Sequence, residues 1–145
     1  MKIIKTRSKD LLIIEPIVHY DDRGYFFESY KNNLINHISF VQDNESKSSK
    51  NTIRGLHFQN PPYEQTKLVR CVSGKVLDIA VDLRSDSETY GEHFKLVLSG
   101  LNKKQFLIPR GFAHGYLVLS REAIVSYKVD NYYSPSHDNG IKWDD

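Results

Sequence analysis

Cysteine, long apolar runs and an excess of charge are all scarce in this 145-residue chain. The one cysteine, Cys71, has no partner for an intrachain disulfide, which excludes a small disulfide-stabilised fold. No apolar run approaches the ~20 residues that span a bilayer. Residues 1–10 lack the long apolar core of a signal peptide. We therefore expect a cytoplasmic protein that does not enter a membrane.

The charge balance and the absence of nucleotide-binding glycine motifs narrow the possible ligands. Twenty lysines and arginines against 18 acidic residues leave a net charge of +2, which is too small to indicate nucleic acid but compatible with an anionic small-molecule substrate. No GxGxxG follows a strand-like run, so nothing in the sequence suggests a nicotinamide or flavin site.

The residues that are present predict a single all-β domain over residues 1–145. Hydrophobic residues make up 39% and charged residues 26% of the chain, an ordinary globular composition. Strand-like runs recur about every ten residues with turn signals between them, which indicates a sandwich or barrel rather than βαβ units. These runs are 11–16, 25–30, 40–44, 52–59, 66–72, 75–83, 94–98, 105–108, 115–119 and 123–129.

Two segments do not read as strands. Residues 31–38, KNNLINHI, carry leucine and isoleucine at roughly helical spacing and predict one short helix of about two turns. Residues 45–51, ESKSSKN, are polar throughout and predict a solvated loop.

The run TIRGLHFQ, residues 52–59, holds the most distinctive set of polar side chains. On a regular strand Arg54 would point to one face, and His57 and Gln59 to the other. A bulge at Gly55 would instead let Arg54 and His57 share one cavity. A lone strand histidine is more often a satisfied core or rim residue than a catalyst, so both interpretations stay open.

Three further patterns carry candidate residues. In KVLDIAVDLR, Asp78 and Asp82 share a face with valine and alanine, which indicates either a polar cavity wall or a solvent face. In IPRGFAHG, a rigid Pro-x-Gly turn places His114 at the start of a strand. Tyr127 and Tyr132 have polar ends, although tyrosine in a sandwich is usually a core or rim residue.

A metal site is weighed because His57 and His114 stand on separate predicted strands and are a possible ligand pair. Such sites usually carry a second histidine two positions after the first, where this chain has Gln59. The remaining histidines fall in predicted loops or in the predicted helix. We expect no metal.

The motifs, taken together and in order, point to one family. RGLHFQ, TKLVRCVSGKVLDIAVDLR, IPRGFAHGY, SYKVDNYYSP and a terminal W-x-D resemble dTDP-4-dehydrorhamnose 3,5-epimerases over nearly the whole chain. The resemblance implies a cupin-type jelly roll of two antiparallel sheets, a homodimer with shared N-terminal strands, and no cofactor. It also implies epimerisation at C3 and C5 of a dTDP-4-keto-6-deoxy sugar, in deoxysugar or surface-polysaccharide synthesis.

The resemblance assigns a role to individual residues. His57 resembles the base and Tyr127 the acid, and Lys67 the residue that contacts the C4 oxygen. Asp78 resembles a cavity aspartate that helps to orient a histidine. The expected substrate-binding residues are His114 in the sugar cavity, Arg54 at the pyrophosphate, Gln42 and Asn44 in the nucleotide pocket, Tyr132 on the base, and Arg23 and Glu28 from the partner subunit.

One departure from the family pattern leaves alternatives open. The family usually continues beyond the terminal tryptophan into a tail whose aspartate pairs with the base histidine, and we expect that tail to be absent from residues 1–145. Either the sequence is truncated, or Asp78 or Asp82 substitutes, or the protein binds without efficient turnover. The competing functions are a C3-only epimerase, a non-catalytic nucleotide-sugar binding module, a ketone-shifting cupin isomerase, which Gln59 and Asn60 disfavour, and a metal-dependent cupin oxygenase.

Overall fold

The chain forms two antiparallel β-sheets packed face to face. The computed structural model describes residues 1–35 and 37–145. The strands are β1 (Lys2–Lys5), β2 (Leu12–Glu15), β3 (His19–Asp21), β4 (Gly24–Phe26), β5 (Gln42–Ser49), β6 (Ile53–Gln59), β7 (Lys67–Ser73), β8 (Lys75–Asp82), β9 (His93–Ser99), β10 (Gln105–Ile108), β11 (Phe112–Val118), β12 (Glu122–Val129) and β13 (Asp138–Gly140). A 3-10 turn covers Pro135–His137.

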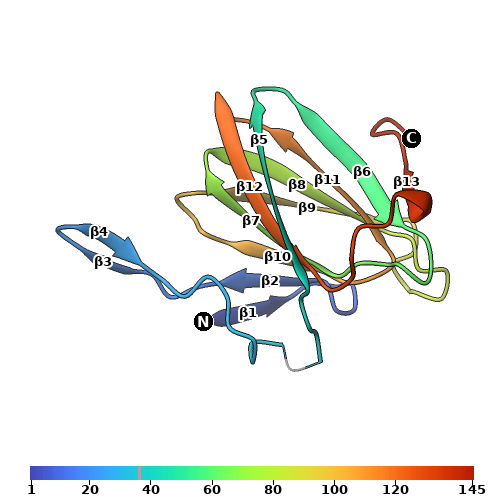
Figure 1. Ribbon diagram of the computed structural model, residues 1–145, viewed down its shortest axis with the longest axis horizontal. Coiled ribbons are helices and arrows are strands. Elements are labelled where there is room, and N and C mark those ends of the chain that lie inside the picture. The colour runs from blue at the N-terminus through green and yellow to red at the C-terminus, as the bar shows by residue number, and fades with distance from the viewer. Residues whose placement is uncertain (36) are drawn as a thin grey trace.

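The strand order is that of a jelly roll, as the sequence predicts. One sheet has six strands in the order β1-β2-β10-β7-β12-β5, and the other has five in the order β13-β6-β11-β8-β9. Consecutive strands β5 and β6 belong to different sheets, and only a short turn joins them (Figure 1). The turn therefore brings the β5 edge of one sheet close to β6 in the other.

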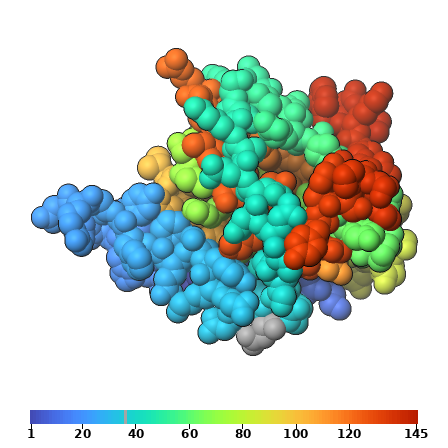
Figure 2. Space-filling model, viewed as in Figure 1, coloured from blue at the N-terminus to red at the C-terminus, as the bar shows by residue number. Residues whose placement is uncertain are grey.

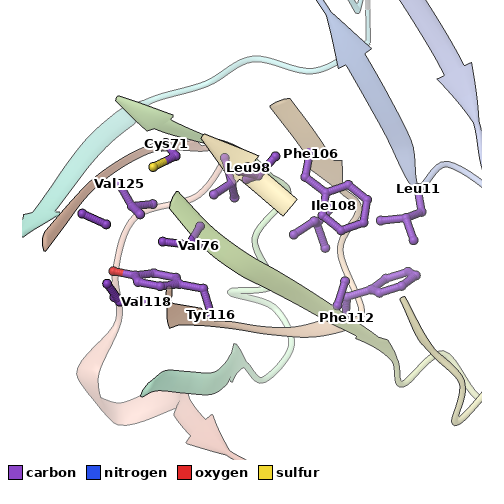
Figure 3. Close-up of a cluster of buried hydrophobic side chains, with 13 residues drawn as sticks. Leu11, Cys71, Val76, Leu98, Phe106, Ile108, Phe112, Tyr116, Val118 and Val125 are labelled. Carbon is purple, nitrogen blue, oxygen red and sulfur yellow. The ribbon is translucent and has the colours of Figure 1, made fainter. Parts of the chain in front are cut away.

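The hydrophobic core lies between the two sheets and consists of buried side chains from both of them. Phe106 and Val125 from the six-stranded sheet pack with Val76 and Phe112 from the five-stranded sheet (Figure 3). The alternating face of β8 that carries Asp78 and Asp82 points into this interior, and both aspartates are fully buried. The face of β8 that carries the two aspartates is therefore not a solvent face.

Two local predictions from the sequence are wrong. The helix expected over residues 31–38 is not formed in 31–35 and 37–38, which make turns instead, and residue 36 lies outside the described residues. Leu34, Ile35 and Ile38 pack against Ile14, Leu68 and Leu107, so their spacing reflects a cover over the sheet. The loop expected over 45–51 is largely strand β5. No helix of the described residues is long and apolar enough to cross a membrane.

The hairpin of β3 and β4 stands away from the two sheets and forms an arm (Figures 1 and 2). Its aromatic side chains are open to solvent, with Tyr20 70% and Phe26 67% exposed. At the base of the arm, the Lys103 ammonium lies 3.7 Å from the Tyr25 ring centroid and 5.6 Å from that of Phe27. A buried lysine over two rings is a cation–π contact that fixes the arm to the body.

Candidate active site

A cavity of about 560 Å³ opens between the two sheets at the β5–β6 side of the fold. The strands β5, β6, β7, β11 and β12 all contribute side chains to its wall, and β13 closes one end. The residues that the sequence analysis singled out and that line this cavity are Asn44, Arg54, His57, Lys67, His114 and Tyr127. Segments distant in sequence thus place six candidate residues in one site.

A bulge in β6 brings Arg54 and His57 to the same cavity. His57 pairs with His114 and Arg54 pairs with Tyr116, so β6 uses one more residue than β11 over this stretch. Gly55 lies within the bulge at φ +110°, and a Cβ there would lie 2.6 Å from the His114 carbonyl oxygen. The bulge interpretation of TIRGLHFQ is therefore correct, and glycine is required because the two backbones approach so closely.

The two residues expected to act as base and acid come from opposite sheets. His57 stands on β6 and is exposed, and its ring has no hydrogen-bond partner among the described residues. Tyr127 stands on β12 in the facing sheet. Burial raises the pKa of its phenol, and a hydrogen bond from Asn44 acts in the opposite direction. Tyr127 is thus kept protonated, which suits a proton donor.

Lys67 lies on the floor of the cavity with 9% of its surface exposed. Desolvation lowers the pKa of its ammonium from 10.5 to about 8, and the charges of Asp78 and Asp138 act in the opposite direction. The ammonium lies 5.7 Å from the Tyr127 ring centroid. A cation in so dry a place is a strong stabiliser of negative charge that develops nearby.

His114 is oriented by a buried carboxylate. Its Nε2 lies 2.8 Å from Oδ1 of Asp78, and its ring centroid lies 6.5 Å from that of Tyr127. The expected role of Asp78 in orienting a histidine thus applies to His114. Asp82 instead accepts hydrogen bonds from Arg84, Ser87 and Thr89, away from the cavity. Neither aspartate hydrogen-bonds to His57.

Several expected binding residues do not line the cavity of their own chain. Arg23 lies at the tip of the arm, where its side chain is 91% exposed and paired with Asp21. Glu28 follows the arm and pairs with Lys31 at 3.0 Å. Tyr132 is 63% exposed and is not among the residues that line the cavity, whereas its neighbour Tyr133 is. Gln42 reaches the site through Asn44, to whose Oδ1 its amide donates at 2.9 Å.

The sequence analysis missed several cavity residues. Ser46 lay in the supposed loop, and its hydroxyl lies 2.6 Å from that of Tyr116. Tyr116 is 5% exposed and follows His114 by two positions on β11, which is a period-two signal that would have identified it. Asp138 is brought in by β13, which pairs with β6. The sequence could not have predicted β13, because its three residues, Asp138–Gly140, are polar or glycine and show no alternation.

The described residues hold no group of three or more histidine, cysteine, aspartate or glutamate side chains arranged around a possible metal position. His57 and His114 face one another across paired strands, but Asp78 is hydrogen-bonded to the Nε2 of His114. The polar side chains that line the cavity include His57, His114, Tyr127 and the buried Lys67.

Comparison with known proteins matches these features to a single family. The sequence model of the family described as dTDP-4-dehydrorhamnose 3,5-epimerase matches residues 5–145. The chain belongs to this family. The resemblance seen in the sequence motifs is therefore confirmed, and so is membership of a family of isomerases.

Curated relatives and solved structures agree with the family assignment. The dTDP-4-dehydrorhamnose 3,5-epimerase of Escherichia coli K12 is 53% identical over 100% of this chain and 81% of its own length. A crystal structure of the Bacillus anthracis epimerase with TDP and pyrophosphate bound superposes with a TM-score of 0.96, at 47% identity over 99% of this chain and 85% of that one. The Legionella pneumophila enzyme in complex with dTDP-4-keto-L-rhamnose gives a TM-score of 0.93, at 45% identity over 98% and 78% of the two chains.

Proposed function

We propose that this chain inverts C3 and C5 of a dTDP-4-keto-6-deoxy sugar, without a cofactor, in the synthesis of dTDP-rhamnose or a related deoxysugar. The observation that carries this proposal is the placement of His57 and Tyr127 on opposite sheets across one cavity. Inversion next to a ketone requires a base on one face of the sugar and an acid on the other. The geometry meets that requirement, and the family assignment supplies the substrate class.

In the proposed reaction, His57 removes the proton on the carbon next to the C4 ketone. The electron pair of that C–H bond forms the enolate, and the negative charge develops on the C4 oxygen. Lys67 and His114 stabilise this oxygen, because both are buried donors in the same cavity. Tyr127 then donates its proton to the opposite face of the carbon, and solvent restores the protonation of both groups.

The rest of the cavity suits a nucleoside diphosphate. Arg54 is exposed and forms none of the ion pairs found among the described residues, so its guanidinium is open to a diphosphate. Asn44, held by Gln42, provides polar contacts for the nucleotide. We assign the aromatic contact with the base to Tyr133 rather than to Tyr132, because only Tyr133 lines the cavity.

We further propose that the enzyme is a cytoplasmic homodimer in which the arm of one protomer completes the site of the other. Its exposed aromatic residues, Tyr20 and Phe26, suit burial against a second copy. Arg23 at its tip would bring a further cation to the nucleotide, and Glu28 follows on the same segment. Nucleic acid and membranes have no part in this proposal.

Solvent exchange at the two carbons tests the reaction directly. The protein is incubated with dTDP-4-keto-6-deoxyglucose in deuterated water, and the C3 and C5 proton signals are followed by NMR. We expect both signals to be lost with the wild-type protein and retained with His57→Ala. His93→Ala is the matched control, because His93 is an exposed histidine of β9 outside the cavity.

Each other outcome selects one of the competing functions. Exchange at C3 alone would indicate a single epimerase. Tight binding of dTDP without exchange at either carbon would indicate a binding module and would overturn the proposal. Retained exchange in His57→Ala would exclude His57 as the base.

A further inference from the structure

The polar strand β5 presents a row of side chains to the candidate active site. Its burial alternates along the strand, with Gln42, Asn44, Ser46 and Ser48 facing inwards and the residues between them exposed. The members of this row do not form a solvent surface. Two of them hydrogen-bond to side chains of the facing sheet, Ser46 to Tyr116 and Ser48 to Arg54, and Asn44 is the strand partner of Tyr127.

The contact between Ser48 and Arg54 has a distinctive geometry. The Nε–H of Arg54 donates to Oγ of Ser48 at 2.8 Å, and an Nη2–H reaches the Lys47 carbonyl oxygen only at 3.5 Å. Ser48 is 8% exposed, whereas Arg54 is exposed at the cavity wall. A small buried hydroxyl thus anchors the inner edge of an otherwise open guanidinium.

The anchored edge determines which nitrogens remain for a ligand. A guanidinium is planar and binds an anion through a pair of N–H groups on one edge. With Nε committed to Ser48, the outer edge formed by the two terminal nitrogens remains for a diphosphate. An anchored arginine also loses less side-chain freedom when the ligand binds, and such preorganisation raises affinity.

We infer that Ser48 is a positioning residue for the nucleoside diphosphate, acting through Arg54. This inference rests on the proposed function, in which Arg54 binds the diphosphate. Ser48 does not line the cavity, and its side-chain hydrogen bond goes to Arg54 and not to His57, Lys67 or Tyr127. Its removal should therefore weaken binding of the diphosphate and leave the proton transfers unchanged.

Calorimetry with three probes tests the inference. In Ser48→Ala we expect dTDP and inorganic pyrophosphate to bind about tenfold more weakly, because a hydrogen bond to a charged group is lost. Thymidine, which has no phosphate, should bind as it does to the wild-type protein. In kinetics, KM should rise by the same factor while kcat stays unchanged, and a general loss of structure would not give this division.

Two further variants complete the design. Ser48→Thr keeps the hydroxyl and should restore dTDP affinity, and Ser49→Ala removes a neighbouring hydroxyl on the exposed face of β5 as a matched control. In an Arg54→Ala background, Ser48→Ala should have no further effect on dTDP binding, because the residue through which it acts is gone.

The inference is overturned if Ser48→Ala binds dTDP and pyrophosphate like the wild type, or if it loses thymidine affinity to the same degree. It is also overturned if the effects of Ser48→Ala and Arg54→Ala simply add. A wild-type protein that shows no exchange into the sugar would refute the proposed function. Pyrophosphate binding would still decide the role of Ser48 in that case.

Discussion

Asp78 and His114 form a buried pair whose Oδ1 and Nε2 atoms are 2.8 Å apart. Asp78 is fully buried and His114 is 5% exposed. A carboxylate on one ring nitrogen fixes the orientation and the tautomer of the ring. His114 is thereby held in one orientation in the cavity wall.

Replacing Asp78 by asparagine should lower kcat without changing dTDP affinity. The amide keeps the size of the side chain but is a weaker hydrogen-bond acceptor than the carboxylate that orients His114. A hydrogen bond to a charged group is worth ~1.5–3 kcal/mol, so we expect kcat to fall by about one to two orders of magnitude. Steady-state kinetics with a parallel dTDP titration measures both quantities. An unchanged kcat would show that His114 acts without the carboxylate.

Activity should decline as the pH rises through about 8, the pKa to which burial lowers the Lys67 ammonium. Below that pH the lysine is charged and stabilises the enolate, and above it the charge is lost. The pKa of Tyr127 is raised, so the tyrosine stays protonated over the same range. A profile of kcat/KM against pH measures this alkaline limb.

Lys67→Met tests the origin of that limb. The variant keeps the length of the side chain without the charge, and we expect kcat to fall about 100-fold, from loss of ~3 kcal/mol of stabilisation. The residual activity should no longer decline near pH 8. Persistence of the limb in Lys67→Met would assign it to another group.

The bulge in β6 should not tolerate a side chain at Gly55. Gly55→Ala places a Cβ 2.6 Å from the His114 carbonyl oxygen, in addition to the strain at φ +110°. Backbone strain of this kind alone costs about 1–3 kcal/mol. Gly91→Ala is the matched control, because it has φ +82° but no atom within 4 Å of the added Cβ.

Urea denaturation should therefore show a larger loss of unfolding free energy for Gly55→Ala than for Gly91→Ala. Only the Gly55 variant should also lose epimerase activity, since the displaced strand carries both Arg54 and His57. Equal effects of the two substitutions on stability and activity would contradict this account.

Asp82 should make the protein sensitive to acid. Burial alone would raise its pKa, but hydrogen bonds from Arg84, Ser87 and Thr89 hold it well below its usual range. A carboxyl whose pKa is lower in the folded state contributes stability above its unfolded pKa, and this stability is lost as the pH falls.

Asp82→Asn should reduce both the stability at neutral pH and its dependence on acid. The substitution leaves Arg84, whose side chain is 19% exposed, without the carboxylate of the fully buried Asp82, and removing one partner of a buried pair costs up to about 3–5 kcal/mol. The unfolding free energy, measured by urea titration at a series of pH values below 5, should fall less steeply than in the wild type. A variant with the wild-type slope would contradict this role.

The sequence predicted the all-β class and the sharing of one cavity by Arg54 and His57 from periodic and local signals, whereas the roles of the site residues came from the family resemblance. Alternation along the strands and regular turn signals indicate an all-β sandwich or barrel without any distant contact, and the family resemblance implies the jelly roll. Gly55 marks the bulge that joins Arg54 to His57, and the alternation of β8 leaves two choices for Asp78, of which burial is one.

The errors arise where local composition misrepresents the environment. Residues 45–49 of β5 read as a loop because both faces of the strand are polar there, one towards solvent and one towards a polar cavity. The segment 31–38 reads as a helix because its apolar residues cover one face of a sheet. Tyr132 and Tyr133 lie in an irregular segment with no periodicity, so only the three-dimensional path of the chain shows which of them faces the cavity.

The extra residue in β6 also limits how this site can be rebuilt elsewhere. Side chains on a strand alternate with a period of two, and Arg54 and His57 are three positions apart, so a straight strand would place them on opposite faces. The two residues between them, Gly55 and Leu56, contain the extra residue that brings both side chains to one face. If RGLHFQ were placed on a straight strand of another protein, Arg54 and His57 would lie on opposite faces, one towards the cavity and the other towards solvent.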